Sequence, residues 1–310
     1  MRKRKYNFDP ELKKYENLNP PIITFMLPLM QKLMGVLYRL EKSDSEVNIE
    51  QIKIPVGDGQ SIRALIYTPV NVIKNSPCLV FFHGGGFVYQ AAPHHFVLAR
   101  KLAKALNVRT LFVDYRMSPK YKFPTAPEDA YDAYTWLLNN VDKLDVDKQR
   151  IALIGDSAGA NLSAALCLMA RDRGVQLPCA QVLIYPYVDR NMKAESMKEF
   201  IDTPMCNKRA VKKFQELYFP YKDHEHVEYF SQVEAPSLEG LPPAYVEIAE
   251  FDCLRDGGLL YARLLKEAGV QVELHETRAT MHGYDIAVDS NIVKNLMAKR
   301  VTFLKKVLFP

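Results

Sequence analysis

The sequence has few cysteines and no pattern that would pair them. Its 310 residues include five, an odd number, none with CxxC spacing: Cys78, Cys167, Cys179, Cys206 and Cys253. Three of the five lie in apolar stretches, which favours buried reduced thiols over a disulfide framework. The cysteine content therefore predicts a cytoplasmic protein.

The sequence also lacks an apolar run long enough to cross a membrane. The most apolar N-terminal stretch, residues 22–30, contains Pro28 and is followed by Gln31 and Lys32, whereas a spanning helix needs about 20 apolar residues. A secretory leader would place its apolar core close to the basic start and end in a small-residue cleavage site, and neither feature is present. We therefore expect no membrane span and interpret residues 20–40 as an amphipathic helix that covers another surface.

Charge of one sign is not in large excess. Lys and Arg number 41 against 36 Asp and Glu, the net charge is +5, and the one basic cluster is residues 2–5. Because the other basic residues are interleaved with acids, we expect no nucleic-acid partner. No repeat or low-complexity segment is visible, and the length suits one large domain or a domain with a small accessory region.

What the sequence does contain is a regular alternation of short apolar strands and amphipathic helices. Residues 47–54 and 61–68, separated by a Gly-Asp-Gly turn, predict an antiparallel hairpin. Six further strands are predicted at residues 78–82, 110–114, 151–154, 181–185, 244–248 and 270–275, with helices at 94–106, 127–140, 158–173, 258–268 and 290–308. This alternation predicts an α/β fold with a mostly parallel eight-stranded sheet flanked by helices, and an active site at the carboxyl ends of the strands.

One connection is longer than a crossover needs. The stretch between residues 185 and 244 contains one predicted helix, Lys208–Tyr218. We interpret it as an insertion that joins the N-terminal helix to form a cap over the sheet. The expected division is 1–45 for the N-terminal cap helices, 46–187 and 236–310 for the core, and 188–235 for the cap insertion.

A candidate nucleophile lies in the motif G-x-S-x-G at residues 155–159, between a predicted strand and a predicted helix. A sharp strand-to-helix turn holds the serine in a strained conformation, and side chains two residues away would collide, which explains the glycines. The turn sets Ser157 at a helix N-terminus, where the dipole favours a developing anion. The alternative is a serine N-cap in a glycine-rich turn, but the position after a buried strand favours a nucleophile.

A second glycine-rich segment, His-Gly-Gly-Gly-Phe at residues 83–87, follows another predicted strand. Consecutive glycines cost chain entropy and suit a loop whose backbone N–H groups face a ligand. We expect the N–H groups of Gly84, Gly85 and Ala158 to form an oxyanion hole, with His83 as structural support of the loop. A phosphate-binding loop is the alternative, but the spacing is not G-x-G-x-x-G and no lysine follows.

The base is assigned to His282 from its place in the chain, after the last predicted strand and before the last helix. Asp252, just beyond the preceding strand, is the expected acid that orients the imidazole. Asp256 is the competitor, although its Asp-Gly-Gly context is typical of a helix N-cap. His224 and His226 have a spacing seen in metal sites, but no third ligand is apparent, so no metal is expected.

Taken in order, the 83–87 loop, Val-Asp-Tyr-Arg at 113–116, the 155–159 motif, Asp252 and His282 resemble the hormone-sensitive-lipase-like carboxylesterases. This is the bacterial family IV type of the α/β-hydrolase superfamily, and the resemblance covers most of the chain. It implies an α/β-hydrolase fold with a helical cap, no cofactor, and hydrolysis of short-chain acyl esters through an acyl-enzyme intermediate.

The chain departs from this family's usual pattern at residues 117–120, at Ala160 and at Cys253, and none of these changes removes a catalytic group. Two other functions remain open. Some relatives of the family are hormone receptors that can lack the base, whereas this chain keeps all three catalytic residues, and an amidase or peptidase would share the same intermediate. The expected partner is a small-molecule ester substrate, and assembly into a homo-oligomer stays open.

Overall fold

The computed structural model describes residues 6–221 and 223–310, which are built around one eight-stranded sheet. Its strand order is β1-β2-β4-β3-β5-β6-β7-β8, with antiparallel pairing of β1 to β2 and of β2 to β4 and parallel pairing elsewhere. The strands are β1 (Val47–Pro55), β2 (Ser61–Pro69), β3 (Ser76–Phe82), β4 (Arg109–Asp114), β5 (Val146–Asp156), β6 (Ala180–Ile184), β7 (Ala244–Phe251) and β8 (Val272–Met281). The predicted mostly parallel eight-stranded sheet is confirmed.

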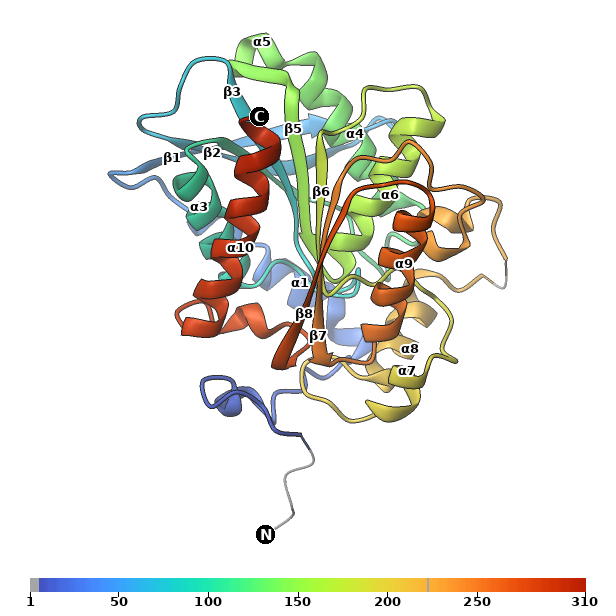
Figure 1. Cartoon of the computed structure of the whole chain (residues 1–310). Helices are drawn as coiled ribbons and strands as arrows, with labels where there is room; N and C mark the ends of the chain where they lie inside the picture. Colours follow the sequence, from blue (N-terminus) through green and yellow to red (C-terminus); the bar gives the residue numbers. More distant parts are fainter. Residues whose placement is uncertain (1–5, 222) are drawn as a thin grey trace.

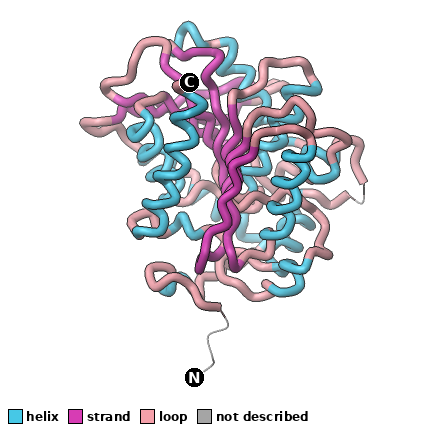
Figure 2. Tube along the Cα trace, viewed as in Figure 1, coloured by secondary structure: helices cyan, strands magenta, loops and turns pink. Residues whose placement is uncertain are grey.

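Helices cover both faces of this sheet (Figure 1), and the strands run between the two helical layers (Figure 2). The helices α3 (Pro93–Leu106) and α10 (Asn291–Leu308) pack on one face, and α4 (Thr125–Asn139), α6 (Ala158–Asp172) and α9 (Arg255–Glu267) on the other. The shorter helices are α1 (Leu27–Met34), α2 (Leu37–Leu40), α5 (Val141–Leu144), α7 (Glu195–Glu199) and α8 (Lys208–Tyr218). The 3₁₀ turns are η1 (Lys13–Tyr15), η2 (Thr24–Met26), η3 (Val227–Tyr229), η4 (Gln232–Glu234) and η5 (Tyr284–Ile286). None of the described helices is long and apolar enough to cross a bilayer.

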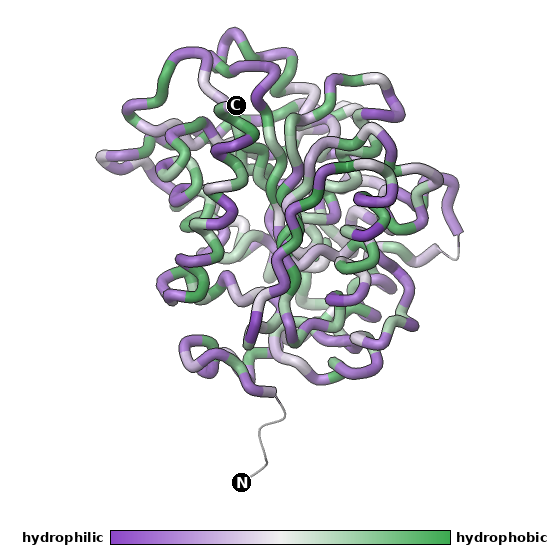
Figure 3. The backbone as a smooth tube through the Cα atoms, in the orientation of Figure 1, coloured by the Kyte–Doolittle hydropathy of each residue, from purple (hydrophilic) through white to green (hydrophobic). Residues whose placement is uncertain are grey.

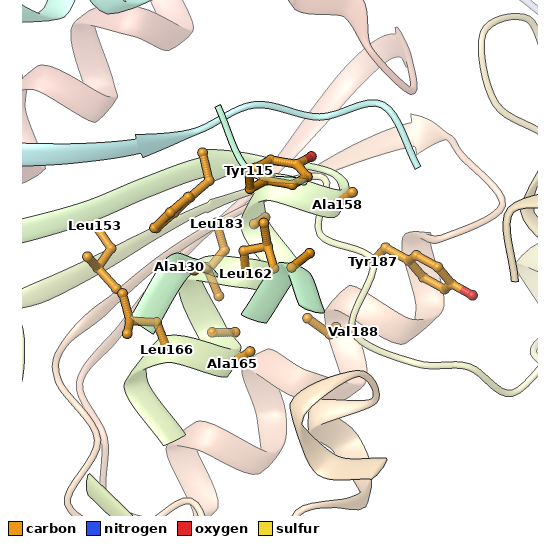
Figure 4. Packing of buried hydrophobic residues seen from close by; sticks show 14 of the residues in the cluster. Tyr115, Ala130, Leu153, Ala158, Leu162, Ala165, Leu166, Leu183, Tyr187 and Val188 are labelled. Atoms are coloured by element: carbon orange, nitrogen blue, oxygen red, sulfur yellow. The ribbon is translucent and has the colours of Figure 1, made fainter. Parts of the chain in front are cut away.

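The central strands are buried on both faces, which accounts for their continuous apolar runs. Every residue of β3 is buried. In Figure 4 Leu166 of α6 lies close to Leu153 of β5, and Leu162 lies close to Leu183 of β6. Hydrophobic colour follows the central strands in Figure 3, while hydrophilic colour prevails in the outer turns. Each face of the sheet packs against its own apolar core. The loops lie at the strand ends, outside these two cores.

The N-terminal segment differs from its prediction. Instead of one amphipathic helix over residues 20–40, the chain forms η2, α1 and α2 with a break at Gly35. There, the Arg63 guanidinium donates to the Gly35 carbonyl at 3.1 Å, and an added Cβ would lie 3.1 Å from that guanidinium. A tertiary contact with β2 therefore ends α1 where the apolar pattern alone would continue.

The last two strands are longer than their apolar runs. β7 ends at Phe251 and β8 at Met281, beyond the residues 248 and 275 expected from the sequence. Polar side chains in the extension are satisfied by the neighbouring strand, since the Thr277 hydroxyl donates to the Ile248 carbonyl at 2.9 Å. The extension matters because it ends immediately before Asp252 and His282.

Candidate active site

The turn between β5 and α6 presents Ser157 at the carboxyl edge of the sheet. Ser157 has φ +53° and ψ −114°, a strained conformation that its N–H supports by donating to the Ile184 carbonyl at 2.8 Å. A Cβ on Gly155 would overlap the Gly159 backbone, and one on Gly159 would overlap the Phe82 carbonyl. The two glycines are therefore required by the close approach of the backbone segments, as the motif predicts.

Loops after β7 and β8 bring an acid and an imidazole to the same serine. His282 Nδ1 lies 2.7 Å from Asp252 Oδ2, and His282 Nε2 lies 2.8 Å from Ser157 Oγ. All three side chains are buried. With its Nδ1–H donated to Asp252, a neutral His282 has only Nε2 to accept the Ser157 proton, which is the geometry that proton abstraction needs.

The charge state of His282 is set mainly by its surroundings. Burial alone would lower the pKa of its imidazole, but the Asp252 carboxylate, with a contribution from Cys206, raises that pKa from 6.5 to about 9. Cys206 contributes to the pKa of His282 because its thiol is close to both His282 and Cys253. The hydrogen bond from Cys253 lowers the pKa of the Cys206 thiol. The raised pKa favours the imidazolium at lower pH, and the neutral form that can accept the Ser157 proton gains population as pH rises.

Asp256 takes no part in this chain of hydrogen bonds. Its carboxylate accepts from the Ser196 N–H at 2.8 Å and from the Arg255 guanidinium at 3.0 Å. The expectation that Asp256 is the N-cap of the next helix is wrong, because α9 already begins at Arg255 and its N-cap is Leu254. Asp256 instead lies in the first turn of α9 and contacts α7 through the Ser196 N–H.

The glycine loop also corrects the predicted set of oxyanion donors. The Gly84 N–H donates to Asp156 Oδ1 at 2.9 Å and is not free for a ligand. Within residues 6–221 and 223–310, no acceptor is found for the N–H groups of Gly85, Gly86 and Ala158. The Gly84 N–H is therefore unavailable, and Gly86 becomes the candidate donor in its place, which three identical residues in a row did not reveal.

Close packing explains why each of these loop positions is glycine. Gly85 and Gly86 have φ of +127° and +60°, and a Cβ on Gly86 would lie 2.5 Å from the Phe214 ring. A Cβ on Gly84 would overlap the Asp156 carboxylate. The loop thus lies between the β5–α6 turn and α8.

His83 lies behind the loop, where the sequence placed it. Its Nδ1 is 2.6 Å from the Gly84 carbonyl, and its ring stacks on Tyr115, whose hydroxyl donates to the His83 carbonyl at 2.8 Å. Burial lowers the pKa of His83 to about 3, so the ring is neutral and its Nδ1–H can donate to Gly84. His95, at the start of α3, adds a contact of 3.3 Å from Nε2 to Asp156 Oδ2.

A buried ionic cluster lies beside His282. The Arg300 guanidinium, from α10, is paired with Glu247 at 2.5 Å and with Asp285 at 3.0 Å. The Tyr185 hydroxyl donates to Asp285 at 3.2 Å, and the Tyr185 ring packs on His282 with 4.8 Å between centroids. The sequence carried no signal for this cluster, because its members are far apart in the chain.

Above Ser157 lies a cavity of about 260 Å³. Its walls combine the glycine loop with the N-terminal segment, through Met30, Gln31 and Met34, and with the long connection, through Met205, Cys206 and Phe214. The Gln31 amide fixes α1 by donating to the Val88 carbonyl at 2.8 Å and to the Ser118 carbonyl at 2.6 Å. Among the described residues, no cluster of His, Cys, Asp and Glu could hold a metal ion.

Comparison with known proteins identifies the family of this chain. A family described as having the alpha/beta hydrolase fold matches residues 79–286. Carboxylesterase NlhH of Mycobacterium tuberculosis is 35% identical over 242 residues, 77% of this chain and 76% of that protein. Ethyl acetate hydrolase of Pseudomonas putida is 31% identical over 78% of this chain and 77% of its own length. The solved structure of a bacterial heroin esterase superposes with a TM-score of 0.88 at 30% identity, covering 98% of this chain and 99% of that one.

Proposed function

Because this chain belongs to the alpha/beta hydrolase family and is a carboxylic-ester hydrolase, we propose that it cleaves short-chain acyl esters with Ser157 as nucleophile. His282 is the base and Asp252 the acid that orients it. One observation carries this proposal: the unbroken hydrogen-bonded chain from Asp252 through His282 to Ser157, at the floor of a cavity.

The reaction begins when His282 Nε2 takes the proton of Ser157 and the serine oxygen attacks the ester carbonyl. The carbonyl oxygen becomes an oxyanion, which the N–H groups of Gly85, Gly86 and Ala158 stabilise. Collapse of the tetrahedral intermediate breaks the bond to the leaving oxygen, which takes the proton from His282 and departs as the alcohol. Water then repeats both steps on the acyl-serine, releasing the carboxylic acid and restoring Ser157.

The cap limits the size of the acyl group. Residues 1–45 and 188–235 are the proposed cap, of which residues 1–5 and 222 lie outside the described residues. Support comes from the cavity walls that Met30, Met34 and Phe214 provide. In Figure 1, α7 and α8 lie at the lower end of the view, near the carboxyl ends of β7 and β8. A chain that fits gains about 0.8 kcal/mol per buried methylene, whereas one that overfills the cavity is penalised. The rate of hydrolysis should therefore rise from acetyl esters to an optimum at a short acyl chain and then fall for longer chains.

Substitution of Ser157 tests the proposal directly. Ser157→Ala should abolish turnover of nitrophenyl esters and labelling by a phosphonate probe while leaving the fold intact. Ser163→Ala is the matched control, since the Ser163 hydroxyl lies on α6 and donates only to the Gly159 carbonyl. Wild-type turnover in Ser157→Ala would refute the assignment. A parallel panel of amides separates an esterase from an amidase, and bound but unhydrolysed ligand would indicate a receptor.

A cytoplasmic location is also proposed. Its support is the set of five cysteines, all of which carry free thiols. Fractionation of the producing cells provides the measurement, and recovery of the protein outside the cytoplasm would contradict it.

A further inference from the structure

Exposed apolar side chains are concentrated on one short part of the chain. Of the fourteen large apolar residues that are exposed within the described part of the chain, eight lie between residues 18 and 40. They are Leu18, Ile23, Phe25, Met26, Leu29, Leu33, Val36 and Leu40. Such a concentration is unusual on a soluble protein and marks an interaction surface.

The most exposed of these residues form a stripe along α1. Phe25, Leu29 and Leu33 recur every four residues, so they lie on one side of the helix and the turn before it, and they are 85%, 56% and 63% exposed. The other side of α1 is also apolar, but there Leu27 is buried and Met30 lines the cavity above Ser157. The stripe is therefore the outer surface of a cavity wall.

Basic side chains line two grooves beside the N-terminal segment. A shallow groove on one side is lined by Lys32, Arg39 and Arg63, together with Gly35 and Val36. A second groove lies between residues 19–22 and α8, and its lining includes Arg209 and Lys213 with one acid, Asp202.

Three of the flanking cations are uncompensated. Lys32, Arg39 and Arg209 have no carboxylate within ion-pair distance among the described residues, whereas Arg63 pairs with Asp114 at 2.6 Å and Lys213 with Glu216 at 3.5 Å. Because free cations border an exposed apolar stripe, the surface suits an apolar partner that also carries negative charge.

We propose that this surface, the docking face, binds an anionic lipid bilayer. It consists of Phe25, Leu29 and Leu33 with the flanking Lys32, Arg39 and Arg209. The apolar side chains enter the acyl boundary, and the cations contact lipid phosphates. A second copy of the chain fits less well, because a two-fold interface centred on the stripe would bring the flanking cations of both copies together. Docking holds this wall of the cavity above Ser157 against the bilayer.

Vesicle flotation tests the apolar part of the docking face. The wild type should float with vesicles of phosphatidylcholine mixed with phosphatidylglycerol and stay unbound with phosphatidylcholine alone. The triple variant F25S/L29S/L33S should lower the partition coefficient by at least roughly tenfold, since each side chain loses its apolar burial. The control V70S/I73S changes exposed apolar residues in the segment between β2 and β3 and should bind like the wild type.

A second variant tests the charged part of the docking face. K32Q/R39Q/R209Q should weaken binding to the mixed vesicles by about fivefold per charge, and added salt should weaken wild-type binding. K294Q/K299Q, on the exposed side of α10, is the control for net charge and should have a smaller effect. Hydrolysis of a soluble acetate ester should be unchanged in all four variants.

Three results would overturn the proposal: no flotation of the wild type with the mixed vesicles, undiminished flotation of F25S/L29S/L33S, or a wild-type dimer in sedimentation equilibrium that this variant dissociates. The last would assign the stripe to a second copy. Docking needs no turnover, so Ser157→Ala should float like the wild type. Failure of the proposed hydrolysis and failure of docking are therefore distinguishable.

Discussion

Ser157 and its partners are held mainly by backbone, whereas the cavity walls above them are held mainly by side chains. At the sheet edge, the Ser157 N–H bonds to β6, and the 83–87 loop and the β5–α6 turn approach so closely that only glycine fits. Above it, α1 is tied through the Gln31 amide and α8 through the ring of Phe214 against Gly86. Substitutions at the edge should therefore affect the chemical step, and substitutions in the walls should affect which ester is preferred.

The largest effect is expected from the acid at the sheet edge. Asp252→Asn should lower kcat by roughly 10⁴, because the amide no longer stabilises the imidazolium or fixes its tautomer. Steady-state kinetics on nitrophenyl acetate measures this loss. Asp256→Asn is the matched control, with its carboxylate engaged by Ser196 and Arg255, and it should stay within a few-fold of the wild type. A reversed ranking would assign the acid to Asp256.

Substitution of Gly86, where the sheet edge contacts the cavity wall, should give the next largest effect on activity. Gly86→Ala places a methyl group against Phe214 at a positive φ and should displace an oxyanion donor, with a loss of roughly 10² in kcat. Gly240→Ala has a similar φ of +72° but no neighbour within 4 Å, so it reports strain alone. Equal activity of Gly86→Ala and Gly240→Ala would contradict the placement of the donor.

The pH profile sharpens the description of the edge. Because the raised pKa of His282 keeps the imidazole protonated, kcat/KM should rise with pH along a limb displaced from about 6.5 toward 9. Cys206→Ala removes one of the groups that raise this pKa and should shift the limb to lower pH. A wild-type limb at or below 6.5 would show that burial outweighs the effect of Asp252 on this pKa.

Stability should depend on pH in the opposite direction. The imidazolium is stabilised by Asp252 in the folded state, so its contribution is complete below about pH 6.5 and is lost as pH rises through about 9. Thermal unfolding of Ser157→Ala across this range measures the contribution without turnover.

The smallest effect is expected in the walls. Met30→Ala with Met34→Ala removes side chains that line the cavity and should move the preferred acyl chain to a longer one, with a change of about fourfold in kcat/KM per added methylene. Leu29→Ala with Leu33→Ala is the control on the exposed side of the same helix. An identical chain-length profile in both double variants would argue against a selective cap.

Much of the fold was predictable because the central strands carry its strongest signal. Burial on both faces requires continuous apolar runs, and turns between them require glycine or polar residues, so most helices and strands lie within a few residues of their predicted bounds. Ser157, Asp252 and His282 each come directly after a strand in the sequence. Because parallel strands end at the same edge of the sheet, the three residues are expected to lie at that edge. Their catalytic roles stay predictions until the variants above are measured.

The details that the sequence did not reveal depend on contacts between distant segments. Arg63 breaks the N-terminal helix at Gly35, Asp156 occupies the N–H of Gly84, and α7 engages Asp256. In each case the local pattern is compatible with two outcomes. A contact with a residue at least 28 positions away in the sequence determines which of them occurs.

By itself, then, the sequence determined the order of strands and helices and the residue types at the sheet edge, because burial and backbone sterics act locally along the chain. The tertiary structure alone decided which two glycines of three keep free N–H groups, which side chains wall the cavity, and that one side of α1 faces solvent with its leucines exposed. These depend on which segments meet in space, and a side chain's partners are fixed only once the sheet has assembled.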